Sequence, residues 1–360
     1  MDDPPGADDD HGLGRRGPLD ASRRVRDGHH RGRGGRGPRL HSVTLRAVLY
    51  DANGHDREVD LTADQPRLSD ARLLWIDLDE RDVDDLSVAA GALGLEREAL
   101  RRLERAERRP NLLRLPERVV LSLGAVEPDD LEARRHEVDI VVGKNHVMTV
   151  HDGRLAAIDE YVTEMKEERE LGRLDAAAFT AGLLDAILTV YFRQIEAIER
   201  DIDALDDVAV RSRRDSSFLS DVLAVRRRIA RLRRSLAPNR EALLPLERPD
   251  FELRSDLGEV WPGLLQRLER AIDAVENARE LLVGSFDLYL GRSSNRTNEI
   301  MKVLTLVSSI ALPGIVLAGI MGMNFKLPFF EVSSNFFVVL GAMVAMSLAI
   351  LAIARWRQWI

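Results

Sequence analysis

The side chains that could perform chemistry in this chain are histidines, carboxylates and basic groups, because the sequence contains no cysteine. The absence of cysteine excludes disulfide scaffolds, thiolate metal sites and cysteine nucleophiles. The eight histidines lack the spacing of metal ligands, and His146 and His151 stand five residues apart on an expected strand. We find no glycine-rich phosphate loop, nucleophile elbow or pair of catalytic acids, so we expect neither an enzyme nor a bound cofactor.

Charged side chains gather on two successive expected helices, with acids on the first and arginines on the second. The acids are Glu199, Asp201, Asp203, Asp206 and Asp207, and the arginines are Arg226, Arg227, Arg228, Arg231, Arg233 and Arg234. We interpret them as complementary faces of an antiparallel helix pair, and attraction of cations by the acids is the alternative. Nucleic acid is not an expected partner, because no aromatic platform accompanies the arginines.

The elements that must position these side chains are indicated by a region near the C-terminus that is almost free of charge. The chain has 52 basic and 60 acidic residues among 360, yet residues 303–354 include only Lys326 and Glu331. Two uncharged segments of 19 residues lie there, and each is long enough to cross the ~30 Å hydrocarbon core of a bilayer. Buried core helices are the alternative. We predict transmembrane helices at 303–323 and 336–354, joined by an outer loop at 324–335.

Basic residues flank both apolar segments and indicate their orientation. Arg292, Arg296 and Lys302 precede the first segment, and Arg355 and Arg357 follow the second. Because positive charge accumulates on the cytosolic side of membrane proteins, we expect both chain ends in the cytosol and the loop outside, in the cell (plasma or inner) membrane. The first residues contain no apolar stretch typical of a secretory signal.

The rest of the chain divides into a tail, a mixed domain and a helical stalk. Residues 1–42 are rich in glycine and arginine, which predicts a disordered tail. Residues 43–171 predict a cytosolic α/β or α+β domain, residues 172–302 a helical stalk, and residues 355–360 a cytosolic C-terminus. Strands are expected at 43–50, 73–78, 118–126, 137–142 and 146–151, and helices at 83–95, 96–107, 154–170, 177–210 and 216–236.

A further helix starts near Val260 and can run straight into the first apolar segment, because no proline occurs from Gly263 to Leu312. Continuous to Met323, it would be roughly 96 Å long. Its apolar residues have heptad spacing, which predicts a surface for parallel association between copies. These residues are Leu265, Leu268, Ile272, Val275, Leu282, Phe286 and Tyr289. Two membrane helices cannot enclose a water-filled path, so we expect conduction to need an oligomer, with close helix approach at Gly314, Gly319 and Gly322.

A specific run of motifs surrounds the first apolar segment. The run from Ser294 to Thr305 (SNRTNEIMKVLT) precedes it, Leu312-Pro313 lies inside it, and Gly322-Met323-Asn324 ends it. A short loop, one more apolar segment and a basic-aromatic end then follow. This combination resembles the CorA family of magnesium and cobalt transporters. The resemblance covers all but residues 1–42.

The resemblance implies an α+β cytosolic domain, a long-helix stalk and two C-terminal transmembrane helices, assembled as a funnel-shaped homopentamer. It implies channel-like transport of Mg²⁺, with Co²⁺ or Ni²⁺ as further cargo, into the cytosol down the electrochemical gradient. Gly322, Met323 and Asn324 would form the outer pore mouth, where a ring of Asn324 oxygens hydrogen-bonds the water shell that Mg²⁺ releases reluctantly. A helix C-cap is the alternative role of Asn324.

Matched to the family, the pore-lining residues are Asn298, Met301, Leu304, Leu312 and Ile315. Met301 and Leu304 would form an apolar constriction that gates by dewetting, and Asn298 a polar ring at the cytosolic entrance. Ile315 stands where the family often has Thr, and Lys326 brings a positive charge to the outer loop.

Regulation of family members involves Mg²⁺ held between two aspartates of neighbouring subunits. Asp287 matches one of them and would be a metal ligand, but Arg102 stands at the position of the other. We hypothesise that an intersubunit Arg102–Asp287 pair replaces the metal; a solvated stalk residue is the alternative for Asp287. Transport of another divalent ion such as Zn²⁺, and a non-conducting membrane-anchored sensor or scaffold, are the alternative functions.

Overall fold

The computed structural model describes residues 45–51, 55–63, 66, 68–69, 72–106, 109–167, 175–211, 217–247, 260–323 and 335–357. The predictions made for the tail at 1–42 and for Asn324, Lys326 and Glu331 lie outside these ranges. The boundaries assigned at residues 171 and 302 stay sequence predictions, and the second falls inside one continuous helix.

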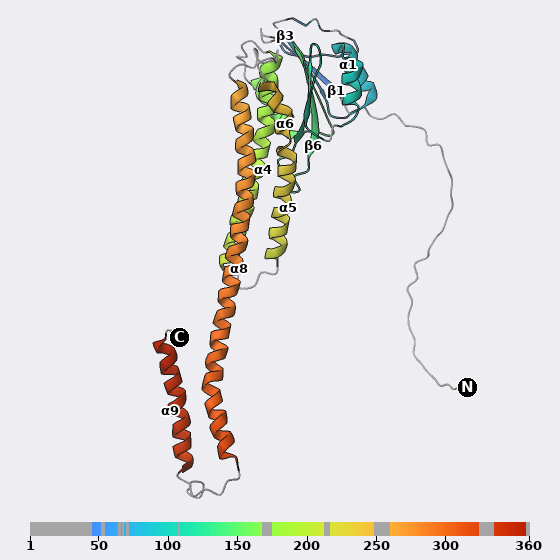
Figure 1. Cartoon of the computed structure of the whole chain (residues 1–360). Helices are drawn as coiled ribbons and strands as arrows, with labels where there is room; N and C mark the ends of the chain where they lie inside the picture. Colours follow the sequence, from blue (N-terminus) through green and yellow to red (C-terminus); the bar gives the residue numbers. More distant parts are fainter. Residues whose placement is uncertain are drawn as a thin grey trace, which may run out of the picture. The chain divides into compact units, whose positions relative to one another are not determined.

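A seven-stranded sheet with the order β2-β1-β3-β7-β6-β5-β4 forms the N-terminal half of the described chain (Figure 1). Only β3 and β7 pair in parallel, and the other neighbours are antiparallel. The strands are β1 (Leu45–Asp51), β2 (Arg57–Glu58), β3 (Arg72–Leu78), β4 (Asn111–Arg114), β5 (Val119–Ala125), β6 (His136–Val142) and β7 (His146–His151).

Alternation along the strands separates two hydrophobic cores, one on each face of the sheet. On one face Leu74, Ile76 and Met148 pack with α1 (Val83–Leu93) and α2 (Arg97–Leu103). On the other face the core contains the helices α3 (Ala156–Glu167) and α4 (Ala176–Arg211). The five expected strands are confirmed. The edge strands β2 and β4 were not predicted, because they are short and partly polar.

The first two helices end earlier than the spacing predicts. Asp82 caps the start of α1 by accepting hydrogen bonds from the backbone of Asp84 and Asp85, and Gly94 ends it in a left-handed conformation with φ of 61°. The prediction that α2 reaches residue 107 is wrong, since it ends at Leu103. There the Leu103 carbonyl accepts a 2.9 Å hydrogen bond from Arg81 Nη1.

The long helix α8 (Val260–Met321) is continuous over 62 residues, or roughly 93 Å, which confirms the predicted run into the apolar segment. The prediction that its heptad face is free for association is wrong. That face is buried in this chain against α4 and against α5 (Phe218–Leu236), where the ring of Tyr289 stacks on Phe218 with centroids 4.2 Å apart. The remaining helices are α6 (Asn239–Leu243), the 3₁₀ helix η1 (Leu244–Glu247) and α9 (Asn335–Trp356).

An ion pair between a buried arginine and a half-exposed aspartate joins α4 and α5, as the two charged faces predicted. Arg228 Nη1 lies 2.8 Å from Asp201 Oδ2, and its Nε and Nη2 donate to Gln194 Oε1. Because the Arg228 side chain is only 6% exposed, its charge must be compensated by these partners. The packing interpretation of these helices is therefore confirmed at this position.

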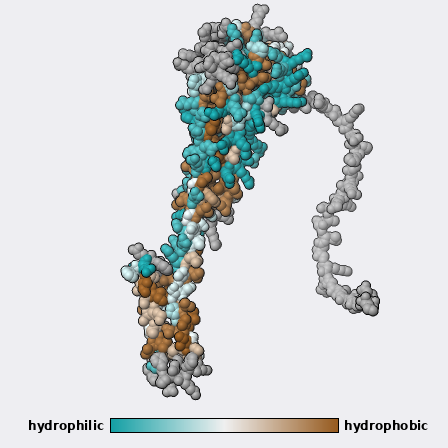
Figure 2. Space-filling model, in the orientation of Figure 1, coloured by the Kyte–Doolittle hydropathy of each residue, from teal (hydrophilic) through white to brown (hydrophobic). Residues whose placement is uncertain are grey.

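Three described helices are long and apolar enough to cross a membrane, namely α4, α8 and α9. The apolar stretch of α4 is 61% buried within the protein, whereas those of α8 and α9 are 0% buried. Figure 2 shows the resulting hydrophobic surface over the paired ends of α8 and α9. The apolar residues of α4 are thus used in the core, while those of α8 and α9 need an apolar environment outside the chain.

Candidate functional site

One face of α8 packs against α9 in an antiparallel hairpin. The half-buried residues of α8 on that face are Leu306, Ile310, Pro313, Gly314, Leu317 and Met321. A Cβ at Gly314 would lie 3.1 Å from Met343 Cε, so glycine lets the two helices approach closely there. Gly319, which we also expected at a close approach, has no other atom within 4 Å of its Cβ position.

The predicted pore-lining residues lie on the opposite face of the same helix. At about 100° per residue, the stripe through Met301, Leu304, Leu312 and Ile315 is centred roughly 180° from the α9 face. Met301 and Leu304 are 54% and 57% exposed, and Leu312 and Ile315 are 63% and 66% exposed. The fold therefore brings these four residues onto one bare apolar face, with exposed Asn298 next to it at the N-terminal end.

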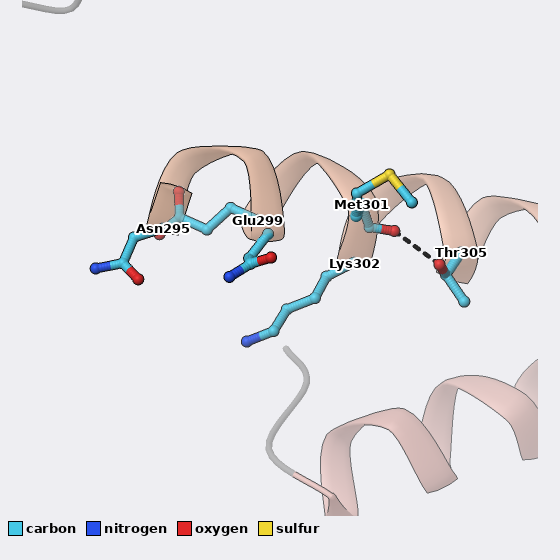
Figure 3. A pocket seen from close by; sticks show the side chains of 6 residues that line it. Asn295, Glu299, Met301, Lys302 and Thr305 are labelled. Atoms are coloured by element: carbon cyan, nitrogen blue, oxygen red, sulfur yellow. Dashed lines mark hydrogen bonds between the residues drawn. The ribbon is translucent and has the colours of Figure 1, made fainter. Parts of the chain in front are cut away.

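A hollow of about 530 Å³ borders this face where the apolar segment begins (Figure 3). It is lined by Asn295, Asn298, Glu299, Met301, Lys302 and Thr305. Thr305 Oγ1 donates to the Met301 carbonyl at 2.7 Å. The amide and carboxylate oxygens in this hollow are groups that suit a hydrated divalent cation.

Sequence reasoning assigned Asn298 and Met301 to a site but missed Asn295, Glu299 and Thr305. Asn295 lies three residues before Asn298 and Thr305 four residues after Met301, while Glu299 lies four residues after Asn295, so all three border the same side of the helix. That spacing was the signal that could have identified them. Among the described residues, no group of three or more histidine, cysteine or carboxylate side chains is arranged to hold a metal ion.

The motif at the end of α8 is only partly described. The Gly322 amide donates to the Ala318 carbonyl at 3.0 Å, and the Met323 amide donates to the Ile320 carbonyl at 3.2 Å. Met323 is 52% exposed. Since Asn324 lies outside the described residues, its roles as pore mouth and as helix cap both stay predictions.

The two residues assigned to regulation lie in different environments. Asp287 is exposed on α8. Arg102 Nη2 donates to Ser122 Oγ at 3.2 Å, next to the buried ion pair in which Arg81 Nη1 lies 2.6 Å from Asp139 Oδ2. Burial raises the pKa of Asp139, while Ser122 and Arg81 act in the other direction. Arg102 thus contacts a polar group of its own chain, and the pairing with Asp287 of another copy stays a prediction.

The two histidines of β7 point to opposite faces of the sheet, because their separation is odd. Burial, together with the charge of Arg118, lowers the pKa of His146 to about 4. Burial alone would lower the pKa of His151, but the hydrogen bond and charge of Asp77 raise it above its ordinary value. Its Nε2 lies 3.1 Å from Asp77 Oδ1 and its Nδ1 lies 2.6 Å from the Gly153 carbonyl. The pair does not form a shared metal site.

A sheet domain, the continuous helix α8 whose apolar end is uncovered, and the uncovered apolar helix α9 define a membrane protein with a large part outside the bilayer. The model of the family described as CorA-like Mg²⁺ transporter protein matches residues 70–355, and the chain belongs to this family. Its members are ion transporters, so the protein is a membrane transporter of divalent cations rather than an enzyme.

Relatives and a solved structure agree with this assignment. The cobalt/magnesium transport protein CorA of Thermotoga maritima is 27% identical over 245 residues, covering 67% of this chain and 70% of that protein. CorA of Methanocaldococcus jannaschii is 24% identical over 335 residues, covering 88% and 100%. The complete structure of the latter transporter superposes with a TM-score of 0.71 at 22% identity, covering 89% of this chain and 100% of that chain, which confirms the fold class.

Proposed function

We propose that the protein is a channel-like transporter that carries Mg²⁺ into the cytosol down its electrochemical gradient, with Co²⁺ or Ni²⁺ as further cargo. The observation that carries this proposal is the bare face of α8 opposite α9, where Met301, Leu304, Leu312 and Ile315 align. A pore lined by several copies of α8 requires the residues at the pore positions to share one uncovered face. Contact with lipid alone makes no such requirement.

Assembly follows from the number of membrane helices. One α8–α9 hairpin cannot enclose a water-filled path, so copies must surround one, and we propose the funnel-shaped homopentamer of the family. The α8 face opposite α9 would line the path, and α9 would lie toward the lipid. The exposed apolar side chains of α8 and α9 are then covered either by neighbouring copies or by lipid.

Recognition of the ion would take place at the mouth formed by Gly322, Met323 and Asn324. Mg²⁺ keeps several waters, and neutral amide oxygens can hydrogen-bond to that shell without holding the ion too tightly for release. Met301 and Leu304 would narrow the path and gate it by dewetting. Asn298, beside Asn295 and Glu299 in the hollow, would receive the ion on the cytosolic side. An inside-negative potential favours entry of a divalent ion by about 4.6 kcal/mol per 100 mV.

We further propose that both termini lie in the cytosol, with the protein in the cell (plasma or inner) membrane. The support is the basic residues that flank the hairpin: Arg292, Arg296 and Lys302 before α8 enters the bilayer and Arg355 and Arg357 after α9. No resident cofactor takes part in this mechanism, because the ion is the cargo.

Regulation is proposed to involve the exposed Asp287 and Arg102 of a neighbouring copy. Arg102 cannot ligate Mg²⁺, but its guanidinium could pair directly with the Asp287 carboxylate. Its present donation to Ser122 occupies Nη2, so the pair would use another nitrogen or replace that hydrogen bond. Closure by cytosolic Mg²⁺ is then weaker than in a protein with two aspartates. Unchanged Mg²⁺-dependent protection from proteolysis after Asp287→Ala would exclude Asp287 as a metal ligand.

The test is growth of a Mg²⁺-transport-deficient bacterial strain on low Mg²⁺. The wild-type chain should restore growth, Asn324→Ala should not, and Asn111→Ala at the edge strand β4 serves as a matched control that should. Absence of rescue despite membrane expression would refute transport of Mg²⁺. Rescue by Asn324→Ala would refute only the role of the mouth. Growth restored under Zn²⁺ limitation but not on low Mg²⁺ would assign Zn²⁺ as the cargo instead.

A further inference from the structure

The ring of His151, at the end of β7, is held between two hydrogen-bond acceptors in the sheet domain. Its side chain is only 2% exposed. Nδ1 lies 2.6 Å from the Gly153 carbonyl, and Nε2 lies 3.1 Å from Asp77 Oδ1. A carbonyl oxygen can only accept, so Nδ1 must carry a proton. The charge of the ring then depends on whether Asp77 accepts a hydrogen bond from Nε2 as well.

A series of hydrogen bonds that starts at Trp75 indicates the role of Asp77. An indole N–H can only donate, and Trp75 Nε1 donates to Thr149 Oγ1 at 3.2 Å. The Thr149 hydroxyl in turn donates to Asp77 Oδ1, the oxygen that faces His151 Nε2. An oxygen that accepts from Thr149 accepts from Nε2 too. Both ring nitrogens therefore carry protons, and His151 is a buried imidazolium whose charge is compensated by Asp77.

Deprotonation leaves His151 with a single N–H for two acceptors. A carboxylate is a stronger acceptor than a neutral carbonyl, so the remaining proton stays on Nε2, which faces Asp77. The lone pair of Nδ1 then faces the Gly153 carbonyl, and two acceptors at hydrogen-bond distance repel each other. The contact with Gly153 is therefore the one that is lost.

Gly153 lies in the turn of residues 152–155 that joins β7 to α3. Its amide donates to the Asp79 carbonyl at 2.8 Å, and its φ of 81° lies in the left-handed region that favours glycine. The helix α3 that follows packs on α4, where Arg193 Nη1 lies 2.7 Å from Glu160 Oε1. The hydrogen bond from His151 thus helps to fix the turn that leads into α3.

A hollow of about 340 Å³ opens beside His151, so water can reach the ring. The charged groups that line the hollow with it come from β1, β2, β3 and the region where α3 begins, and they are Arg46, Glu58, Asp77, Asp79, Arg154 and Asp159. Arginines stay charged and carboxylates are ordinarily ionised at neutral pH, which leaves His151 as the group that titrates there. Asp79 needs a control, because burial and the charge of Asp77 raise its pKa.

We propose that His151 is a pH-sensitive latch, which as an imidazolium joins Asp77 to the Gly153 carbonyl and on deprotonation releases the turn of residues 152–155. Burial lowers the pKa of His151, but the hydrogen bond and charge of Asp77 raise it above its ordinary value. The latch is therefore closed at pH 6.5 and opens as the pH rises further. In the orientation proposed above the sheet domain lies in the cytosol, so the latch responds to cytosolic pH.

The experiment is hydrogen–deuterium exchange of the full-length protein in detergent from about pH 6 to about pH 9, corrected for the intrinsic pH dependence of amide exchange. In the wild type, protection of peptides that cover residues 152–158 should fall roughly tenfold over this range, as expected when a hydrogen bond from a charged group is lost. Asp77→Asn should abolish this transition. Without the carboxylate nothing holds the proton on Nε2, and a neutral ring can keep its Nδ1–H on Gly153.

Two further variants make the result specific. Asp79→Asn makes the same chemical change in the same hollow, and should keep the transition but move it to lower pH, because the charge of Asp79 also favours the imidazolium. His151→Gln places an amide nitrogen where Nε2 lies and nothing at Nδ1, so the turn should exchange rapidly at every pH.

Three results would overturn the proposal. They are a turn whose protection does not change with pH in the wild type, an unchanged transition in Asp77→Asn, and loss of the transition in Asp79→Asn, which would assign the titration to Asp79. The two asparagine variants keep the test decisive even if His151→Gln fails to fold. Ion flux is not the readout, so failure here leaves the transport proposal untouched.

Discussion

The two halves of α8 carry comparable apolar stripes on one unbroken helix, but they have opposite surroundings. In the N-terminal half the heptad residues Leu268 and Val275 are 0% and 2% exposed, because α4 and α5 cover them. In the C-terminal half Leu304 and Leu312 are 57% and 63% exposed. Hydrophobic spacing alone therefore does not say what covers a helix. The N-terminal half is completed by its own chain, and the C-terminal half needs lipid or further copies.

Truncating one leucine in each half of α8 should give the largest difference between the halves in the free energy of unfolding. Leu268→Ala should lower the free energy of unfolding by about 2–5 kcal/mol, because it leaves a cavity in a closed core. Leu312→Ala should change it by about 0.5 kcal/mol, as at an exposed position. Denaturant unfolding of the full-length protein in detergent measures both. Equal losses would show that Leu312 is buried against another copy as tightly as Leu268 is within the chain.

Acidification should destabilise the sheet and leave the stability of the apolar half of α8 unaffected. His146 has a pKa of about 4 in the folded protein and about 6.5 when unfolded, so only the unfolded state binds a proton between these values. Its contribution to stability is present above pH 6.5 and falls by about 3 kcal/mol as the pH drops to 4. Hydrogen exchange should show β7 opening before α9, and His146→Gln should flatten this dependence.

The raised pKa of His151 has the opposite effect on the pH dependence of stability. Its contribution is fully present below pH 6.5 and is lost as the pH rises through its higher folded value. Asp77→Asn, which removes the carboxylate facing its Nε2, should abolish that loss on raising the pH. A thermal unfolding series at increasing pH, starting below about 6.5, measures this loss. An unchanged pH profile in the variant would contradict the assignment of the loss to the His151–Asp77 pair.

Within the C-terminal half, two faces of α8 can be compared directly. Leu304 and Val307 are 57% and 58% exposed, but only Leu304 lies on the proposed pore face. Leu304→Ala should change Mg²⁺ flux into proteoliposomes about tenfold, which corresponds to ~1.4 kcal/mol on the barrier. Val307→Ala, with matched exposure, should not. Equal effects of the two substitutions would refute the assigned face.

The smallest effect is expected at the surface of the N-terminal half. Arg233 Nε lies 2.6 Å from Glu276 Oε1, but the two side chains are 56% and 35% exposed. Glu276→Gln should therefore cost about 0.5 kcal/mol, and the cost should vanish at high salt. Unfolding at two ionic strengths measures this. A larger, salt-independent loss would show that polar contacts as well as apolar packing hold the stalk together.

The expected elements were largely correct where one dominant pattern exists. Strands of β-branched residues, such as 137–142, were predicted because alternate positions are apolar. The edges β2 and β4 were missed, since a two-residue strand has no periodicity of its own and pairs only through its neighbour. The hollow at Asn295 and Glu299 was missed because the helical spacing that joins these residues to Asn298 was not followed beyond the positions matched to the family.

The environment of Arg102 could not be read from its position in the chain. The pairing with Asp287 of another copy stays a prediction, but within its own chain the fold directs Arg102 toward Ser122 and the buried pair of Arg81 and Asp139. These residues come from α2, from β5 and β6, and from the turn after β3. Only the pairing of distant strands brings their charges together.

Counting residues along the chain was enough to predict that two segments near the C-terminus enter a membrane and that one long helix leads into the first. Lipid accepts a helix on its composition and length alone, and both can be counted along the chain. Which apolar stripe is covered from within was decided by the tertiary structure. Burial depends on the partner that the fold supplies, and α4 and α5 reach only the N-terminal half of α8 while α9 covers a single face of the rest.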